Sequence, residues 1–244
     1  MFLKAAINGG RTRAESPTVP LTPAEIAAEA SRAIALGAAV VHAHARTADG
    51  RQSIHPDDVG AMVRAVRAHD PSVIIGTTTG LWTCSGHAER MRHLADWPED
   101  AMPDFASVAF SEEGAAEAAE LVVSRGIVLE SAVWSMDDVP ALLAASTLHQ
   151  NVRILIEPEI DDPQQAVAEC REIASALRAA GVNCSILYHG LEGSTWPVLR
   201  AAIEDGVEAR IGLEDVTVDR TGAIADNSAM IADAMSMARI HCAG

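Results

Sequence analysis

Short apolar runs alternate with longer amphipathic segments along the whole chain. Each run is brief and rich in aliphatic residues, which is typical of a buried strand. The segments between the runs carry helix start and stop signals. Strands are therefore predicted at residues 3–7, 39–45, 73–77, 105–109, 127–133, 152–156, 184–188 and 209–213.

Helix boundary signals support the same division of the chain. Thr22 is placed to cap a helix, with Pro23 at its first position and Glu25 as the partner in a capping box. Further helices are predicted at residues 56–69, at 163–180 and at 227–240, the second of which stops at Gly181.

The alternation amounts to eight strand–helix units, which predicts parallel strands joined by crossover helices. Eight units in 244 residues fit a (β/α)₈ TIM barrel, whose usual size is about 250 residues. An open doubly wound sheet would leave edges and generally uses fewer strands. Because no proline-rich linker divides the chain, we expect an α/β fold with one barrel domain over residues 1–244.

Charge narrows the range of partners. The chain has 34 acidic and 18 Lys and Arg residues, for a formal net charge of −16. Such a chain repels nucleic acid and anionic membranes, so neither is expected as a partner. The four cysteines have no CxxC spacing, and the start of the chain runs directly into the first predicted strand. We therefore expect a cytoplasmic protein without a signal peptide or a membrane span.

Active sites of TIM barrels lie at the C-terminal ends of the strands. His42, His44 and Arg46 stand there on one face of the second predicted strand, since side chains alternate along a strand. Two imidazoles at this spacing can hold one divalent metal. Glu214, at the end of the eighth strand, is the candidate third ligand. The alternatives are a chance His-x-His pair and a Glu214 that only faces solvent.

Other polar residues near strand ends have two interpretations each. Glu130 lies in an apolar strand, so it has either a functional role or a structural ion pair with arginine. The run 77–79 of threonines could donate hydroxyl groups to a ligand or simply fill a strand. A positive rim able to hold a carboxylate or phosphate is predicted from Arg11, Arg13, Arg46 and Arg210.

Three segments together resemble one enzyme family. They are AAINGG at residues 5–10, HAHAR at residues 42–46 followed by DG at 49–50, and RIGLED at residues 210–215. In sequence and in position these segments are similar to motifs of the β-keto acid cleavage enzymes, whose founding activity is 3-keto-5-aminohexanoate cleavage.

The resemblance implies a zinc enzyme with a (β/α)₈ fold that condenses a β-keto acid with acetyl-CoA. The products would be acetoacetate and a new acyl-CoA, and the family implies a homo-oligomer. The implied zinc ligands are His42, His44 and Glu214. The implied catalytic residues are Asp215, Arg210, Glu130, Thr78 and Ser107, and the substrate-binding candidates are Asn8, Arg11, Arg46 and Thr79.

One departure from the family bears on the substrate. Arg11 stands where the family has an acidic residue that recognises the amino group of the founding substrate. We therefore expect a substrate with a neutral or anionic tail. Acidic loops at residues 109–113 and 157–162 keep two alternatives open. One is a metal-dependent hydrolase or aldolase that does not use CoA, and the other is a non-catalytic, metal-binding member of the family.

Overall fold

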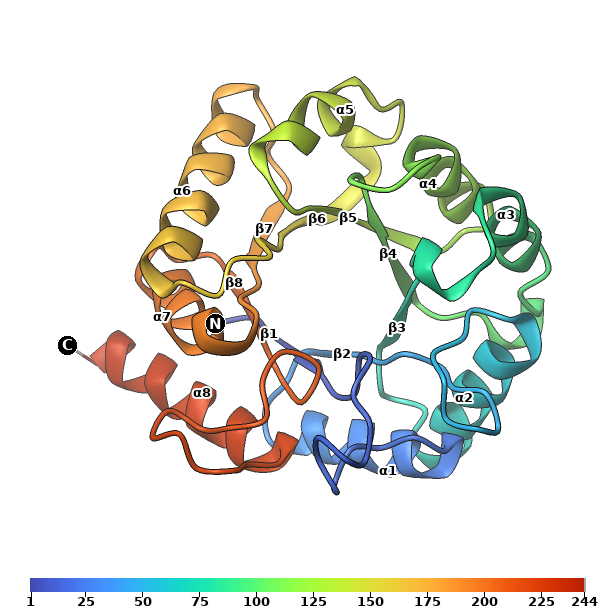
Figure 1. Cartoon of the computed structure of the whole chain (residues 1–244), viewed down its shortest axis with the longest axis horizontal. Helices are drawn as coiled ribbons and strands as arrows, with labels where there is room; N and C mark the ends of the chain where they lie inside the picture. Colours follow the sequence, from blue (N-terminus) through green and yellow to red (C-terminus); the bar gives the residue numbers. More distant parts are fainter. Residues whose placement is uncertain (244) are drawn as a thin grey trace.

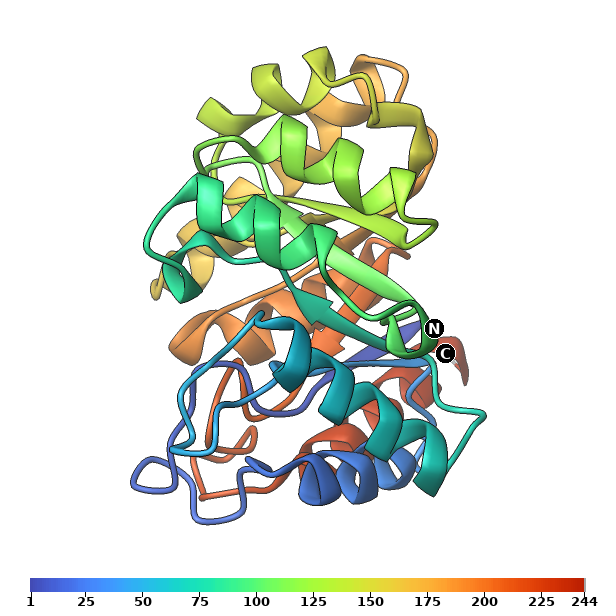
Figure 2. The same cartoon turned by 90° about the vertical axis from the view of Figure 1, so that its right-hand side faces the viewer.

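Eight parallel strands close into a barrel in their order along the chain, with β1 paired to β8. This computed structural model describes residues 1–243, with side chains through residue 241. The predicted (β/α)₈ fold is confirmed, and the helices pack along the outside of the barrel (Figures 1 and 2). The predicted domain range 1–244 includes one residue outside the described part. The strands are β1 (Leu3–Ala6), β2 (Val40–His42), β3 (Ile75–Thr78), β4 (Phe105–Ala109), β5 (Val128–Val133), β6 (Asn151–Ile156), β7 (Ser185–Tyr188) and β8 (Glu208–Ile211).

Helices follow each strand, and those predicted from the sequence are present. At the start of α1, the Thr22 side chain accepts a hydrogen bond from the Glu25 N–H, and the Glu25 carboxylate accepts one from the Thr22 N–H. Hydrogen bonds from the Thr22 backbone, helped by Arg13 nearby, lower the pKa of Glu25 to about 2 although partial burial opposes this. The helices are α1 (Pro23–Ala35), α2 (Pro56–His69), α3 (His87–Ala95), α4 (Ala115–Ser124), α5 (Val139–Ala144), α6 (Pro163–Ala179), α7 (Thr195–Glu204) and α8 (Asn227–Ala243).

β2 and β8 end two or more residues before the apolar pattern predicts, and both ends shape the site. β2 stops at His42, because the N–H of His44 donates to the side-chain oxygen of Asn8 at 2.8 Å rather than to a neighbouring strand. β8 stops at Ile211, because the chain turns at Gly212. A Cβ atom at Gly212 would lie 2.0 Å from the carbonyl oxygen of Ala6, so only glycine fits there.

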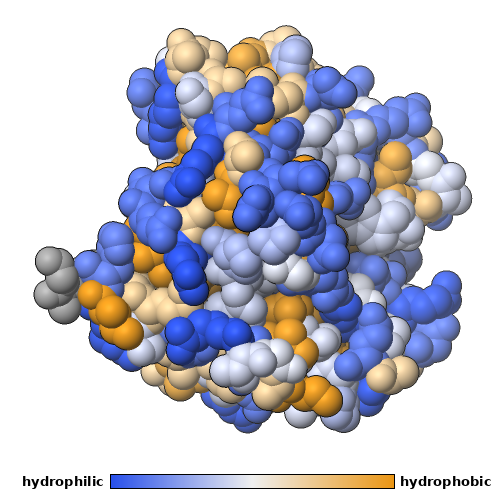
Figure 3. Space-filling view, turned by 60° about the vertical axis from the view of Figure 1, so that its left-hand side comes forward, coloured by the Kyte–Doolittle hydropathy of each residue, from blue (hydrophilic) through white to orange (hydrophobic). Residues whose placement is uncertain are grey.

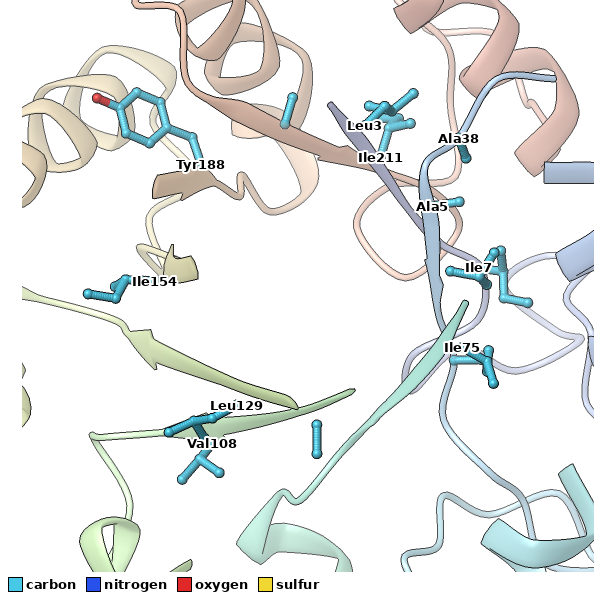
Figure 4. Close-up of a cluster of buried hydrophobic side chains, with 14 of the residues drawn as sticks. Leu3, Ala5, Ile7, Ala38, Ile75, Val108, Leu129, Ile154, Tyr188 and Ile211 are labelled. Atoms are coloured by element: carbon cyan, nitrogen blue, oxygen red, sulfur yellow. The ribbon is translucent and has the colours of Figure 1, made fainter. Parts of the chain in front are cut away.

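The main hydrophobic core lies between the strands and the surrounding helices. Labelled side chains such as Leu3, Ile154 and Ile211 point away from the barrel centre in Figure 4. Aromatic residues are only 3% of the chain, so aliphatic side chains make up most of this core, with Trp97, Phe110 and Tyr188 among them.

The N-terminal half of the barrel interior is charged rather than apolar. Glu130 on β5 binds Lys4 on β1 at 2.5 Å and also pairs with Arg153 on β6. Arg153 in turn contacts Glu208 on β8 at 2.5 Å. Burial lowers the pKa of Lys4, and the charge of Glu130 opposes this. Of the two interpretations of Glu130, the structure therefore shows the ion pair with arginine.

A small apolar layer lies next along the strands, toward their C-terminal ends. Ala132 and Leu155 each follow a member of the charged group by two positions, so they face the barrel interior as well. They pack with Leu187 of β7 and with half-buried Ala109 of β4. The buried ion pairs of Lys4, Glu130, Arg153 and Glu208 form a charged floor of the barrel. The apolar layer separates part of this floor from the polar residues at the strand ends.

Hydrophilic side chains cover most of the face shown in Figure 3, with hydrophobic ones scattered among them. Within the described residues, every helix is too short or too polar to cross a membrane. The cysteines with described side chains, Cys84, Cys170 and Cys184, are free thiols.

The buried ion pairs of the charged floor lead us to expect a large effect of Glu130 on the free energy of unfolding. Replacing Glu130 by alanine leaves Lys4 buried without its partner, so we expect a loss of about 3–5 kcal/mol in the free energy of unfolding. The double variant K4M/E130L removes both charges and should recover most of this loss, because Arg153 keeps Glu208. Urea unfolding followed by circular dichroism measures both changes.

The matched control is the exposed pair of Arg64 and Asp100, whose nitrogen and oxygen lie 2.9 Å apart. Asp100→Ala should leave the unfolding free energy nearly unchanged. A cost for Glu130→Ala no larger than that for Asp100→Ala would contradict the assigned role of the floor.

Candidate active site

The two histidines predicted as metal ligands face each other at the end of β2. Their Nε2 atoms lie 3.1 Å apart, and both side chains are buried. The Nδ1 atom of His44 is hydrogen-bonded to the side-chain oxygen of Gln52. Because an amide oxygen only accepts, Nδ1 must carry the proton, and the lone pair of Nε2 then points toward His42.

Glu214 follows β8 and approaches the two Nε2 atoms from the other side of β1. Its carboxylate oxygens lie 3.4 Å from Nε2 of His44 and 3.8 Å from Nε2 of His42. Two glycines make room for it. A Cβ atom at Gly9, where φ is +45°, would lie 2.1 Å from the Cγ of Glu214, and Gly212 provides the turn that precedes Glu214.

This donor set fits a divalent cation. The ligand atoms of His42, His44 and Glu214 all lie within 4.8 Å of one another. Nitrogen ligands about 2.05 Å from a tetrahedral metal would be about 3.3 Å apart, close to the spacing of the two Nε2 atoms. Burial lowers the pKa of His42, which favours the neutral, ligating imidazole. One oxygen of Glu214 is buried without a hydrogen-bond partner. Three protein ligands leave a coordination position for a substrate.

Arg210 joins the metal-ligand candidate to a second carboxylate. Its guanidinium contacts Glu214 at 2.7 Å and donates two hydrogen bonds to Oδ1 of Asp215, at 2.7 and 3.0 Å. Burial would lower the pKa of Arg210, but the charges of Asp215 and Glu214 raise it, so Arg210 stays a cation. The second oxygen, Oδ2 of Asp215, is buried with no hydrogen-bond partner. It is free to accept a proton.

His189 and Glu157 extend this array, and the sequence analysis did not select them. His189 lies between the two carboxylates, with Nε2 2.9 Å from Asp215 and Nδ1 3.2 Å from Glu157. Burial and Arg210 act to lower the pKa of His189, but the two carboxylates raise it to about 9. Burial acts to raise the pKa of Glu157, but the charges of His189 and Arg210 lower it to about 2. The available signal was their position directly after β7 and β6.

Asn8 and Arg46 bind backbone groups in the loops that carry the metal-ligand candidates. Asn8 accepts from the N–H of His44 and donates to the carbonyl of His44 at 3.0 Å, so its amide fixes that backbone from both sides. Arg46 donates to the carbonyl oxygens of Gly9 and Gly50. Both residues thus hold the loops after β1 and β2 in place.

The predicted positive rim does not form. Arg11 binds the carboxylates of Glu15 and Glu192 and the carbonyl of Leu213. Arg13 binds Glu25, and Arg46 and Arg210 are engaged as described above. Some partners are near in sequence, such as Glu15 for Arg11, but sequence alone could not show that Glu192 also binds Arg11 from another loop.

Three catalytic candidates form a row across neighbouring strands. Thr78 of β3 is paired in register with Ser107 of β4, which is paired with Glu130 of β5. Paired residues of parallel strands share a face, so all three face the barrel interior. The Thr78 hydroxyl accepts a hydrogen bond from the N–H of Gly80, and the Thr79 hydroxyl donates to the carbonyl of Ser107.

A cavity of about 240 Å³ opens to solvent beside the metal-ligand candidate Glu214. Glu214, His189 and Glu157 form its inner part. Trp82 and Glu159 are exposed and form its outer part together with half-buried Trp134, and Pro158 and Leu191 complete the lining.

The fold, the metal-ligand candidates and the Arg210–Asp215 pair together form a candidate active site in a TIM barrel. The family model for beta-keto acid cleavage enzymes matches residues 1–241, and the chain belongs to this family. It is 28% identical to a 3-keto-5-aminohexanoate cleavage enzyme of Fusobacterium nucleatum, over 90% of this chain and 84% of that protein. It is 24% identical to a 3-oxoadipate:acetyl-CoA acetyltransferase of Cupriavidus necator, over 97% of this chain and 87% of that protein.

Solved structures agree with the fold. The apo structure of ObcA superposes with a TM-score of 0.74 at 18% identity, over 91% of this chain. This chain spans 62% of that longer chain.

Gln52 provides a test of the site. It fixes the orientation of the His44 ring, so Gln52→Leu should weaken binding of a divalent metal by about 10–100-fold. Competition with a chromophoric zinc chelator measures the affinity. Gln165→Leu, at an exposed position of α6, is the control and should bind like the original protein. Equal affinities for all three proteins would contradict the role of Gln52 in orienting His44 for metal binding.

Proposed function

We propose that this protein is a zinc-dependent β-keto acid cleavage enzyme that uses acetyl-CoA. The reaction exchanges acyl groups: R–CO–CH₂–COO⁻ and acetyl-CoA give R–CO–CoA and acetoacetate. The single observation that carries the proposal is Asp215, whose unpartnered oxygen lies beside the metal-ligand set and is aligned by Arg210. The family and the name of the C. necator relative support the use of acetyl-CoA.

The nitrogen and carboxylate donors suit zinc, which when bound would polarise the ketone of the acid. Asp215 then acts as the base. It takes a proton from the methylene group between the ketone and the carboxylate, and Arg210 prevents rotation of its carboxylate. The buried site keeps bulk water from protonating the resulting carbanion.

The bond changes balance without any other reactant. The carbanion attacks the acetyl carbonyl of acetyl-CoA, forming one carbon–carbon bond and releasing the CoA thiolate. The thiolate attacks the original ketone carbon, and the bond between that carbon and the former methylene breaks. The electron pair leaves as the enolate of acetoacetate, which takes back the proton from Asp215.

The remaining candidates act around these steps. Thr78 and Ser107 stand on the inner face of the barrel, where their hydroxyls can donate to oxygens that gain charge. Asn8, Arg46 and Thr79 hold the ligand loops and strand ends through the hydrogen bonds described above. Glu130 acts indirectly, by holding Lys4 and Arg153 in the charged floor below the site. Assembly into a homo-oligomer and residence in the cytoplasm stay predictions from the sequence.

Asp215→Asn tests the base directly. The substitution keeps the size of the side chain and removes its basicity, so we expect the exchange rate to fall by about 10²–10⁴-fold. The assay supplies the zinc-loaded protein with acetyl-CoA and a panel of β-keto acids, and follows acetoacetate and the new acyl-CoA by mass spectrometry.

Asp137→Asn is the matched control, because this exposed side chain lies outside the site, and its rate should stay unchanged. Full turnover by Asp215→Asn would refute the base assignment. One equivalent of bound zinc with no acetoacetate from any acid would refute the proposed reaction.

A further inference from the structure

We propose that His189 is a positioning residue for the base Asp215, and that Glu157 holds His189 in place for this task. This inference rests on the proposed function, since Asp215 is the base of that reaction. It gives a role to a buried histidine that the proposed bond changes leave unused.

The two carboxylate oxygens of Asp215 have different surroundings. Oδ1 accepts two hydrogen bonds from Arg210, at 2.7 and 3.0 Å, and Nε2 of His189 lies 2.9 Å from the same oxygen. A carboxylate oxygen has two lone pairs, so Arg210 already occupies those of Oδ1. Oδ2 is buried without a hydrogen-bond partner among the described residues, so its lone pairs can take a proton. Two cations therefore contact one oxygen and leave the other one basic.

The contacts of His189 require a charged ring. Its Nε2 atom faces Asp215 at 2.9 Å, and its Nδ1 atom faces an oxygen of Glu157 at 3.2 Å. A neutral imidazole has a proton on one nitrogen and a lone pair on the other, so it would turn that lone pair toward a carboxylate. The imidazolium has an N–H group on both nitrogens. His189 thus places a positive charge beside Asp215, and Glu157 keeps that charge in place.

The loop that begins with His189 holds the main chain of Asp215 as well. The N–H of Glu192 donates to the carbonyl oxygen of Asp215 at 2.8 Å, and the hydroxyl of Thr195 donates to it at 3.3 Å. Glu192 has a φ of +49°, which residues other than glycine seldom adopt. Backbone strain of this kind persists where the surrounding structure requires it, and it is common at active sites. The loop therefore fixes the backbone of Asp215, while His189 contacts its side chain.

Loss of His189 would loosen the attachment of the base. Oδ1 of Asp215 would then depend on Arg210, whose guanidinium also binds Glu214 at 2.7 Å. A shift of a reacting group by about 1 Å can lower a rate by about 100-fold, because proton transfer needs close alignment. The proposed role of His189 therefore predicts an effect on the rate of the reaction rather than on binding of the acid.

His189→Gln tests the inference, because glutamine has a similar reach and lacks the charge. We expect kcat to fall by about 10–100-fold, while KM for the acid and the affinity for zinc stay close to the original values. In the described part of the chain, the ion contacts of His189 are with Glu157 and Asp215 rather than with the metal-ligand candidates. His149→Gln, at an exposed position before β6, is the matched control and should change none of these values. An unchanged kcat for His189→Gln, or a zinc affinity that falls as far as kcat does, would overturn the inference.

A double variant separates the placement of Asp215 from the balance of charge. His189→Gln leaves Glu157 with a more distant cation, Arg210 at 3.8 Å, and we expect this to weaken the fold. Adding Glu157→Gln removes the uncompensated charge, so the free energy of unfolding should return toward its original value. The kcat of the double variant should stay low, because Asp215 still lacks its second cation. Recovery of kcat would show that His189 only balances Glu157, and it would overturn the inference.

Hydrogen exchange separates this inference from the proposed function, because it follows the base without acetyl-CoA. In heavy water the zinc-loaded protein should exchange the methylene protons of acetoacetate faster than the solvent does. His189→Gln should slow this enzyme-dependent exchange by about 10–100-fold. Slower exchange in His189→Gln, together with no acyl transfer by the original protein, would refute the proposed function and support the inference. Equal exchange rates for the two proteins, or no exchange by the original protein, would overturn the inference.

Discussion

The guanidinium of Arg210 is the contact on which the site depends. It binds Glu214 and Asp215 at once, so one buried cation sets the relative position of a metal-ligand candidate and the proposed base. Its burial makes this arrangement costly to disturb, since loss of Arg210 would leave two buried carboxylates without compensation. Gly9 and Gly212 complete the constraint, because only residues without a Cβ atom let Glu214 reach the two histidines.

Charge is distributed unevenly in this acidic chain, because the charges inside the barrel and at the site are paired with opposite charges. Below the site, Lys4 and Arg153 are balanced by Glu130 and Glu208 inside the barrel. At the site, Arg210 and His189 offset three carboxylates. Arginines near the mouth are bound to protein carboxylates and carbonyl oxygens. The acidic excess of the chain therefore lies mainly on its outer surface.

Much of the fold could be predicted from local sequence, because each signal acts within a few residues. The capping box of α1, the proline that begins α2 and the glycine after α6 are such signals. The pairing of His42 with His44 follows from strand alternation, and Glu214 follows from its position at the end of the eighth predicted strand. Gln52, Glu157 and His189 could not be selected this way, since their roles arise only when separate loops meet. The same holds for Arg11, because its partner Glu192 is distant in sequence although Glu15 is near.

The central claim is that this site transfers the acetyl group of acetyl-CoA to the methylene carbon of a β-keto acid. The most direct measurement uses acetyl-CoA with ¹³C in both acetyl carbons and an unlabelled acid, with the acetoacetate product read by ¹³C NMR. We expect label in the methyl and keto carbons of acetoacetate and none in its methylene and carboxylate carbons. Label in the methylene and carboxylate carbons, or unlabelled acetoacetate, would contradict it.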